Sequence, residues 1–136
     1  MTTKRLSLIV SSLLLSLALV ACGSQKIEAK TPIVKDFLIN NVSVQDNFGF
    51  IVTSAQDILF KADTQNGSSI NRLTIYAKKD DGDYSTLTEC SSSNCEYLWS
   101  VSAVNNGVYS FLVEAEDERG ATSALPYRNA LSISIR

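Results

Sequence analysis

The 136-residue sequence contains no histidine, only three cysteines, two prolines and one tryptophan. Without histidine the chain cannot form a Ser-His-Asp triad, a Cys-His pair or an H-E-x-x-H zinc site. It also lacks a glycine-rich phosphate-binding loop and a basic stripe of the kind that contacts nucleic acid. We therefore expect a protein that is not an enzyme, that binds no metal and no cofactor, and that does not bind nucleic acid.

The first 21 residues have the composition of a secretory signal peptide. Residues 1–5 carry two positive charges, and residues 6–20 are Leu, Val, Ile, Ala and Ser without any charge. Because about 20 apolar residues are needed to span a membrane, this segment is short for a permanent anchor helix. A basic start, a short apolar core and small residues at the end are typical of a cleaved signal. We expect residues 1–21 to be removed, and a permanent N-terminal helix is the alternative.

The apolar segment ends in Leu19-Val20-Ala21-Cys22. This stretch resembles a bacterial lipobox and identifies the chain as similar to bacterial lipoproteins. The resemblance implies cleavage after Ala21 and transfer of a diacylglyceryl group to the Cys22 sulfur, which would attach the protein to a membrane. A free thiol at Cys22, the alternative, is unusual in an exported protein. Gly rather than Asp follows Cys22, which favours the outer membrane in an envelope of the Gram-negative type and leaves its periplasmic or surface side open.

Cleavage after Ala21 would leave residues 22–136, which is enough for one domain with its own core. Without Lys4 and Arg5, ten basic side chains remain against 14 acidic ones, so the formal charge is −4. Residues 22–32 are polar and aperiodic, and we interpret them as a lipidated tether. Residues 33–136 are the expected folded domain.

Within residues 33–136, apolar side chains recur at every second position, as in strands with one buried face. Turn-forming residues separate these stretches, and no helical pattern follows residue 30. The clearest strands are expected at 57–63, 72–78, 96–103, 108–117 and 131–135, and further ones within 34–44, 48–53 and 84–89. The pattern predicts an all-β sandwich of about seven antiparallel strands.

Three stretches resemble bacterial immunoglobulin-like domains, including fibronectin type III-like and PKD-like ones: INRLTIYAKKDDG, NNGVYSFLVEAEDERGATS and LSISI. The resemblance implies an immunoglobulin-like β-sandwich. It also implies a tyrosine corner, in which the Tyr109 hydroxyl bonds to the backbone of the preceding turn. Such a corner requires a crossover between sheets, whereas Asn106-Gly107 is typical of a hairpin. The chain shows no inter-sheet cysteine pair and no tryptophan on the third strand, unlike antibody domains.

Cys90 and Cys95 lie five positions apart across Ser-Ser-Ser-Asn. In an oxidising compartment we expect a disulfide that closes a tight surface loop and contributes about 2 kcal/mol of stability. Zinc binding would need two more ligands, and redox activity would favour the C-x-x-C spacing. Free thiols are the remaining alternative.

Acidic and aromatic residues offer further candidate sites. A glycosidase-like carboxylate pair is possible on paper, but we expect a solvated face at Glu114, Glu116, Asp117 and Glu118. Three aspartates crowd one turn, but Ala77, Lys79 and Thr88 break the EF-hand pattern, so we expect a solvated turn at Asp80, Asp81 and Asp83. A carbohydrate platform would use Tyr76 and Tyr84 as outward residues and Tyr127 beside Pro126 in a loop. Trp99 is expected in the core.

These features predict a lipid-anchored protein whose domain acts in recognition or adhesion through sheet edges and loops, with a protein or a glycan as partner. One alternative is a periplasm-facing accessory subunit of an envelope complex. Another is an inhibitor of a hydrolase, presented on the loop 91–94.

Replacing the lipid-bearing sulfur should remove the membrane anchor. We expect Cys22→Ser to leave the chain unlipidated, so that it moves from the detergent phase to the aqueous phase in a detergent partitioning experiment. A variant that partitions with detergent as the wild type does would contradict the lipobox interpretation.

Overall fold

The computed structural model describes residues 30–65 and 69–136. The expected signal peptide, the lipobox with Cys22 and tether residues 22–29 lie outside the described residues.

Nine strands and one short 3-10 helix make up the described chain. In chain order they are β1 (Ile33–Ile39), β2 (Val42–Ser43), β3 (Phe50–Val52), β4 (Gln56–Gln65), β5 (Ile70–Lys79), β6 (Ser85–Cys90), β7 (Asn94–Val101), η1 (Ala103–Asn105), β8 (Gly107–Asp117) and β9 (Thr122–Ile133).

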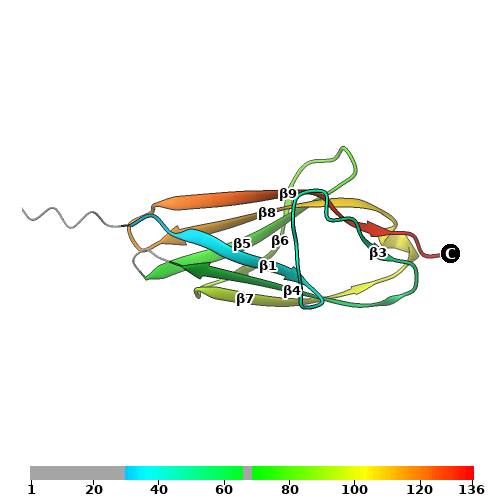
Figure 1. Ribbon diagram of the computed structural model, residues 1–136, viewed down its shortest axis with the longest axis horizontal. Helices are drawn as coiled ribbons and strands as arrows, with labels where there is room; N and C mark the ends of the chain where they lie inside the picture. The colour runs from blue at the N-terminus through cyan, green and yellow to red at the C-terminus, as the bar shows by residue number, and fades with distance from the viewer. Residues whose placement is uncertain (1–29, 66–68) are drawn as a thin grey trace, which may run out of the picture.

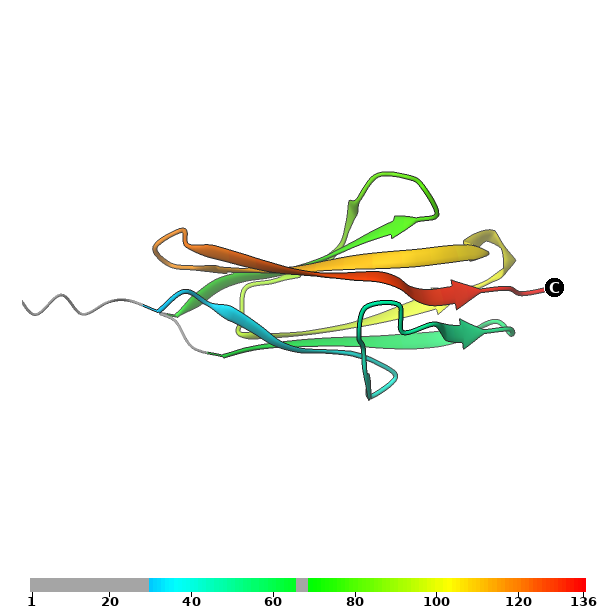
Figure 2. The same ribbon diagram turned by 45° about the horizontal axis from the view of Figure 1, so that its top comes forward.

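The strands form two sheets that pack face to face (Figures 1 and 2). One sheet has the order β2-β1-β4-β7, and the other has the order β3-β9-β8-β5-β6. The expected all-β sandwich is confirmed, although it has nine strands instead of about seven, and the β3–β9 pair is parallel. The connections β4–β5, β6–β7 and β7–β8 each cross from one sheet to the other.

One additional strand arises because the segment expected within 34–44 is broken by a turn. Ile39 pairs with Val42, and the two residues between them, Asn40 and Asn41, both have positive φ (48° and 65°). Asparagine tolerates this conformation and is typical of two-residue hairpin loops. The Asn-Asn pair was therefore the turn signal that divides β1 from β2.

Aromatic rings from both sheets meet in the core. Phe37 of β1 and Phe60 of β4 come from one sheet, and Phe111 of β8 comes from the other. The Phe111 ring centre lies 5.5 Å from that of Phe37 and 5.2 Å from that of Phe60. All three side chains are fully buried, so this cluster holds the two sheets together.

Buried residues follow the expected alternation in β4 and through most of β5 and β8, whereas the pattern in β9 is irregular. The inward set includes Ile58 and Ala62 in β4, Leu73, Ile75 and Ala77 in β5, and Val113 and Ala115 in β8. Trp99 is half-buried and packs against the core, with its ring centre 6.0 Å from that of Phe60. Period-two hydrophobicity therefore identified the core face correctly.

The region around Pro126 was expected to be a loop, and this expectation is wrong. Pro126 lies inside β9 opposite Leu112. Here β9 is an edge strand, because β3 pairs only with residues 131–133. A proline, which has no N–H to donate, is tolerated in an edge strand. Tyr127 is consequently buried and packs on Phe37 at 5.0 Å between ring centres.

Asn106-Gly107 does not form a hairpin. It joins β7 to β8 through η1, and these two strands belong to different sheets. Gly107 has φ of 150°, and a Cβ atom at this position would lie 2.6 Å from the Lys79 side chain. Glycine is favoured here by the backbone conformation, and its presence is not evidence of a two-residue turn.

Phe111 should contribute strongly to stability because it contacts both aromatic rings of the opposite sheet. We expect Phe111→Ala to lower the free energy of unfolding by about 3–5 kcal/mol, as measured by urea denaturation. The matched control is Leu125→Ala on the neighbouring strand, where the side chain is exposed and a change of less than about 1 kcal/mol is expected. Equal effects of the two substitutions would contradict the assigned core.

Candidate functional site

The turn between β8 and β9 is organised around a buried carboxylate. Asp117 has no exposed surface. Its Oδ1 atom accepts the backbone N–H groups of Arg119 (2.9 Å) and Ala121 (3.0 Å). Its Oδ2 atom accepts the Arg119 guanidinium at 2.6 Å. The expectation of a solvated side chain is wrong for Asp117, because a charge next to Arg119 and two N–H donors can be buried.

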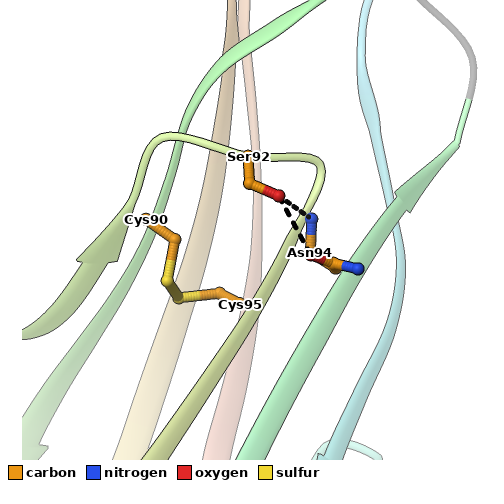
Figure 3. The surroundings of a disulfide bond; sticks show 4 residues. All are labelled: Cys90, Ser92, Asn94 and Cys95. Atoms are coloured by element: carbon orange, nitrogen blue, oxygen red, sulfur yellow. Dashed lines mark hydrogen bonds between the residues drawn. A yellow bond between two sulfur atoms is a disulfide. The ribbon is translucent and has the colours of Figure 1, made fainter.

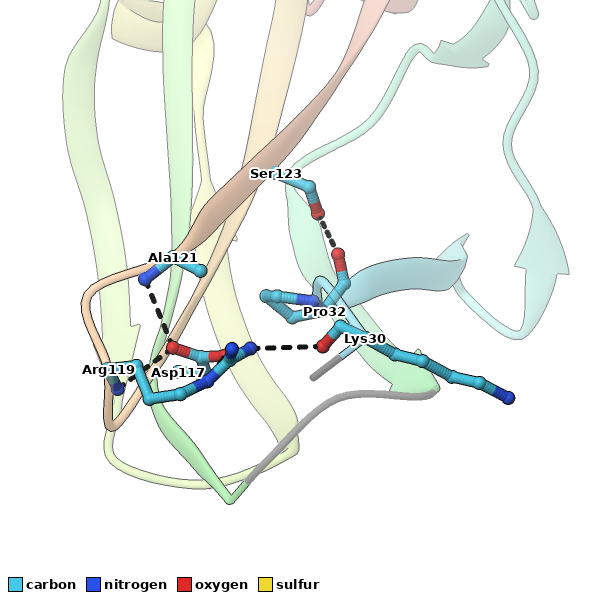
Figure 4. Close-up of polar contacts among 6 residues, drawn as sticks. All are labelled: Lys30, Pro32, Asp117, Arg119, Ala121 and Ser123. Atoms are coloured by element: carbon cyan, nitrogen blue, oxygen red, sulfur yellow. Dashed lines mark hydrogen bonds and ion pairs between the residues drawn. The ribbon is translucent and has the colours of Figure 1, made fainter. Parts of the chain in front are cut away.

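The same turn holds the residues that lead into β1 (Figure 4). The Arg119 guanidinium donates to the Lys30 carbonyl at 3.2 Å, and the Ser123 hydroxyl donates to the Pro32 carbonyl at 2.5 Å. These contacts fix the point at which the chain enters the sandwich, beside the β8–β9 turn. We call this end of the sandwich, where Lys30 and Pro32 are bound by Arg119 and Ser123, the attached end.

The charge of Asp117 is stabilised in the folded protein. Burial alone would raise the pKa of this carboxyl group. Hydrogen bonds from the Arg119 side chain and from the Ala121 and Arg119 N–H groups, together with the Arg119 charge, outweigh burial and hold the pKa of Asp117 below its ordinary value.

The other carboxylates of this region serve different contacts. Glu116 forms an ion pair with Arg72 at 2.5 Å, and Arg72 also lies 3.9 Å from Glu89. Glu114 accepts a long hydrogen bond of 3.4 Å from the Tyr76 hydroxyl. Glu116 and Glu114 share the outer face of their sheet, whereas Asp117 is buried. Asp117 therefore does not share a surface with Glu114 and Glu116.

The expected disulfide between Cys90 and Cys95 is present, with a Cα–Cα distance of 5.5 Å (Figure 3). Cys90 ends β6 of one sheet and Cys95 lies in β7 of the other. The inference that no cysteine pair joins the sheets is therefore wrong, because this bond ties their neighbouring edges together. Cys95 is also buried, so the bond reaches the core and is not confined to a surface loop.

The loop between these cysteines has its own hydrogen bonds. The Ser92 hydroxyl donates to Asn94 Oδ1 at 2.9 Å and accepts the Asn94 N–H at 3.3 Å (Figure 3). The Ser93 carbonyl accepts the backbone N–H of Thr64 near the end of β4. Since Gln65 pairs with Ile33, the loop 91–94 lies at the attached end.

The expected hydrogen bond of Tyr109 is also present. Its hydroxyl donates to the Asn105 carbonyl in the preceding turn at 2.8 Å. The buried ring packs edge-on against Trp99, with 5.2 Å between ring centres. Burial is the main cause that raises the pKa of Tyr109, and the nearby Asp80 charge is the second. This bond fixes the crossover from β7 to β8.

The acidic turn after β5 is partly occupied by backbone contacts. Asp80 has φ of 51°, and its carboxylate accepts the Val108 N–H at 2.9 Å. Its own N–H donates to the Val108 carbonyl at 2.7 Å. The expectation of a solvated turn is therefore wrong for Asp80, whose carboxylate is bound to the backbone of β8. Among residues 30–65 and 69–136, no three acidic or cysteine side chains gather closely enough to hold a metal ion.

The three candidate tyrosines do not form one surface. Tyr127 is buried in the core. Tyr84 is exposed in the turn before β6, with the Lys78 ammonium 5.4 Å from its ring centre. Tyr76 lies half-buried on β5 and bonds to Glu114. A carbohydrate platform built from all three residues is therefore contradicted by the fold.

Sequence analysis did not identify the aliphatic surface at the end opposite the attached end. Ile51 and Val108 both lie beside Ser132 of β9, so they form a row across the outer face. Ile51 is 68% exposed, and Val104 of η1 is 82% exposed. Asn106 bonds to Ile135, which places the η1 region near the C-terminus. We call Ile51, Val104 and Val108 the aliphatic end.

No protein-family model matches the sequence, and no curated protein is similar to it. In the part of the chain that the structure describes, there is no helix with the length and hydropathy needed to cross a membrane.

Asp117 should make the domain sensitive to acid. Because its folded-state pKa is lowered, its charge stabilises the fold above the unfolded-state pKa of about 3.9, and this contribution disappears as the pH falls through the folded-state value. We expect Asp117→Asn to be less stable than the wild type in urea at neutral pH, with the difference shrinking as the pH falls below the unfolded-state pKa of about 3.9.

The matched control for this experiment is Glu118→Gln, which alters the exposed neighbouring carboxylate. Glu118→Gln should leave the urea midpoint nearly unchanged from that of the wild type, both at neutral pH and in acid. A difference between wild type and Asp117→Asn that is constant with pH would contradict the stabilised charge.

Proposed function

We propose that this protein is a bacterial lipoprotein, anchored through a diacylglyceryl group on Cys22, whose single domain binds a partner without catalysis at the outer membrane or cell surface. The observation that carries the proposal is Leu19-Val20-Ala21-Cys22 directly after a basic start and a short apolar core. More than one acyl chain would be needed for stable anchoring.

The strand order supports the immunoglobulin-like assignment. Strands β1, β4 and β7 lie in the order of the A, B and E strands of that fold, and β9, β8, β5 and β6 lie in the order G, F, C and C′. The bond from Tyr109 to the Asn105 carbonyl occupies the place of a tyrosine corner. Domains of this architecture serve many functions, so the site and not the fold has to identify the partner.

The arrangement of the two ends suggests where a partner binds. β1 begins at the attached end, and the C-terminus lies at the opposite end (Figure 1). A tether that precedes residue 30 would hold the attached end toward the membrane, and the aliphatic end would then face away from it. Exposed aliphatic side chains favour a protein partner over a glycan, which is bound mainly by aromatic rings and hydrogen bonds.

The same surface is compatible with the alternative role of a periplasm-facing subunit of an envelope complex, because a permanent partner would also cover aliphatic side chains. The inhibitor hypothesis receives less support. The loop 91–94 lies at the attached end, where a nearby membrane would restrict access by a hydrolase.

Protease treatment of intact cells separates the two locations. If the domain acts at the cell surface, an antibody against residues 33–136 should lose its signal when protease is added to intact cells. A soluble periplasmic protein that stays intact serves as the control for an unbroken outer membrane. Protection of the domain until lysis would overturn the surface location and leave the envelope subunit as the function to test by cross-linking.

A further inference from the structure

Strand β7 is an unprotected sheet edge. It pairs with β4 over eight residues, from Asn94 to Val101, without a register shift, and it contains neither proline nor glycine. Among the described residues, the other edges are short or irregular. β2 and β3 have two and three residues, and the part of β1 that β2 leaves unpaired contains a register shift between Val34 and Asp36. β6 pairs with β5 through a register shift, and β9 contains Pro126. Proteins usually interrupt or cover such edges, because a regular one can pair with another strand.

The direction of the β7 backbone groups follows from its neighbour β4. The Leu59 carbonyl accepts the Asn40 N–H, and the Leu59 N–H donates to Asn40 Oδ1, both at 2.8 Å. Leu59 therefore points its backbone groups toward β1 and away from β7. Its partner Leu98 belongs to a non-hydrogen-bonded pair, so the N–H and C=O groups of Leu98 point outward.

The same alternation directs the backbone groups of Glu96 and Ser100 outward. Their side chains lie on the outer face with that of Leu98, which is 58% exposed. The edge thus offers three consecutive outward-facing hydrogen-bonding positions centred on Leu98.

We propose that two copies of this chain pair through β7, as antiparallel strands related by a two-fold axis at Leu98. Leu98 then lies opposite Leu98 of the second copy, and Glu96 lies opposite Ser100 of the second copy. All three positions become hydrogen-bonded pairs, which gives about six backbone hydrogen bonds. Each sheet continues into the other, forming one eight-stranded sheet across the pair.

The side chains of β7 suit this register. The Leu98 side chain packs against Leu98 of the second copy, and no two like charges face each other. Tyr97 and Trp99, which are half-buried on the inner face, come opposite each other in a closely spaced non-hydrogen-bonded pair. A register centred on Glu96 would place two carboxylates opposite each other. A register centred on Tyr97 would place Leu98 opposite Glu96 of the second copy. Of these three registers, the one with its two-fold axis at Leu98 is the most self-complementary, and the proposal does not depend on the proposed lipid anchor.

Charge substitutions at Leu98 test both the pairing and its register. Sedimentation equilibrium of the full chain in a density-matched detergent should show a dimer for the wild type below about 100 μM. Leu98→Lys and Leu98→Glu should each raise the dimer dissociation constant more than about tenfold, because like charges would face each other. An equimolar mixture of the two variants should recover the dimer, because opposite charges then meet at the axis.

Leu125→Lys is the matched control, since Leu125 is an exposed leucine on the other sheet, and it should dimerise as the wild type does. Three outcomes would overturn the proposal: a wild type that stays monomeric up to about 100 μM, variants that dimerise as well as the wild type, or a mixture that remains monomeric although both variants are folded by circular dichroism.

Discussion

Packing of Phe111 against Phe37 and Phe60 is the interaction on which the rest of this structure depends. These rings belong to strands far apart in the sequence, and they fill the space between the two sheets. The disulfide and the Asp117 network lie nearer the margins of the sandwich, where they add local restraints to the packing of the aromatic cluster. The inner faces of the central strands are thus buried in the core. The ends of the sandwich and the edge strand β7 remain available for binding.

The two ends of the sandwich differ in their surface chemistry. At the attached end, Asp117 and Arg119 hold the start of the domain through the carbonyl of Lys30. At the other end, Ile51 and Val104 expose aliphatic side chains. In an antiparallel β7 pair the two attached ends point in opposite directions, because β7 runs along the length of the domain (Figure 1).

Sequence patterns predicted the strands that alternate cleanly, and they failed where the backbone is irregular. β4, β5 and β8 follow period two because only one face of each is buried. Tyr127 was misplaced because Pro126 suggests a loop, whereas an edge strand accepts proline. The burial of Asp117 could not be predicted, since it depends on Arg119 and on backbone N–H groups that only the folded turn brings together. Likewise, five-residue spacing predicts a disulfide between Cys90 and Cys95, but only the sheet topology reveals that it joins two sheets.

The central claim is that a lipid on Cys22 ties this sandwich to a membrane. Mass spectrometry of the protein isolated from bacterial membranes tests it most directly, because the N-terminal peptide reports both the cleavage site and the modification. The account predicts a peptide that begins at Cys22 and carries the mass of a diacylglyceryl group, with or without an additional acyl chain. A peptide that begins at residue 1, or one that begins at Cys22 without lipid, would contradict it.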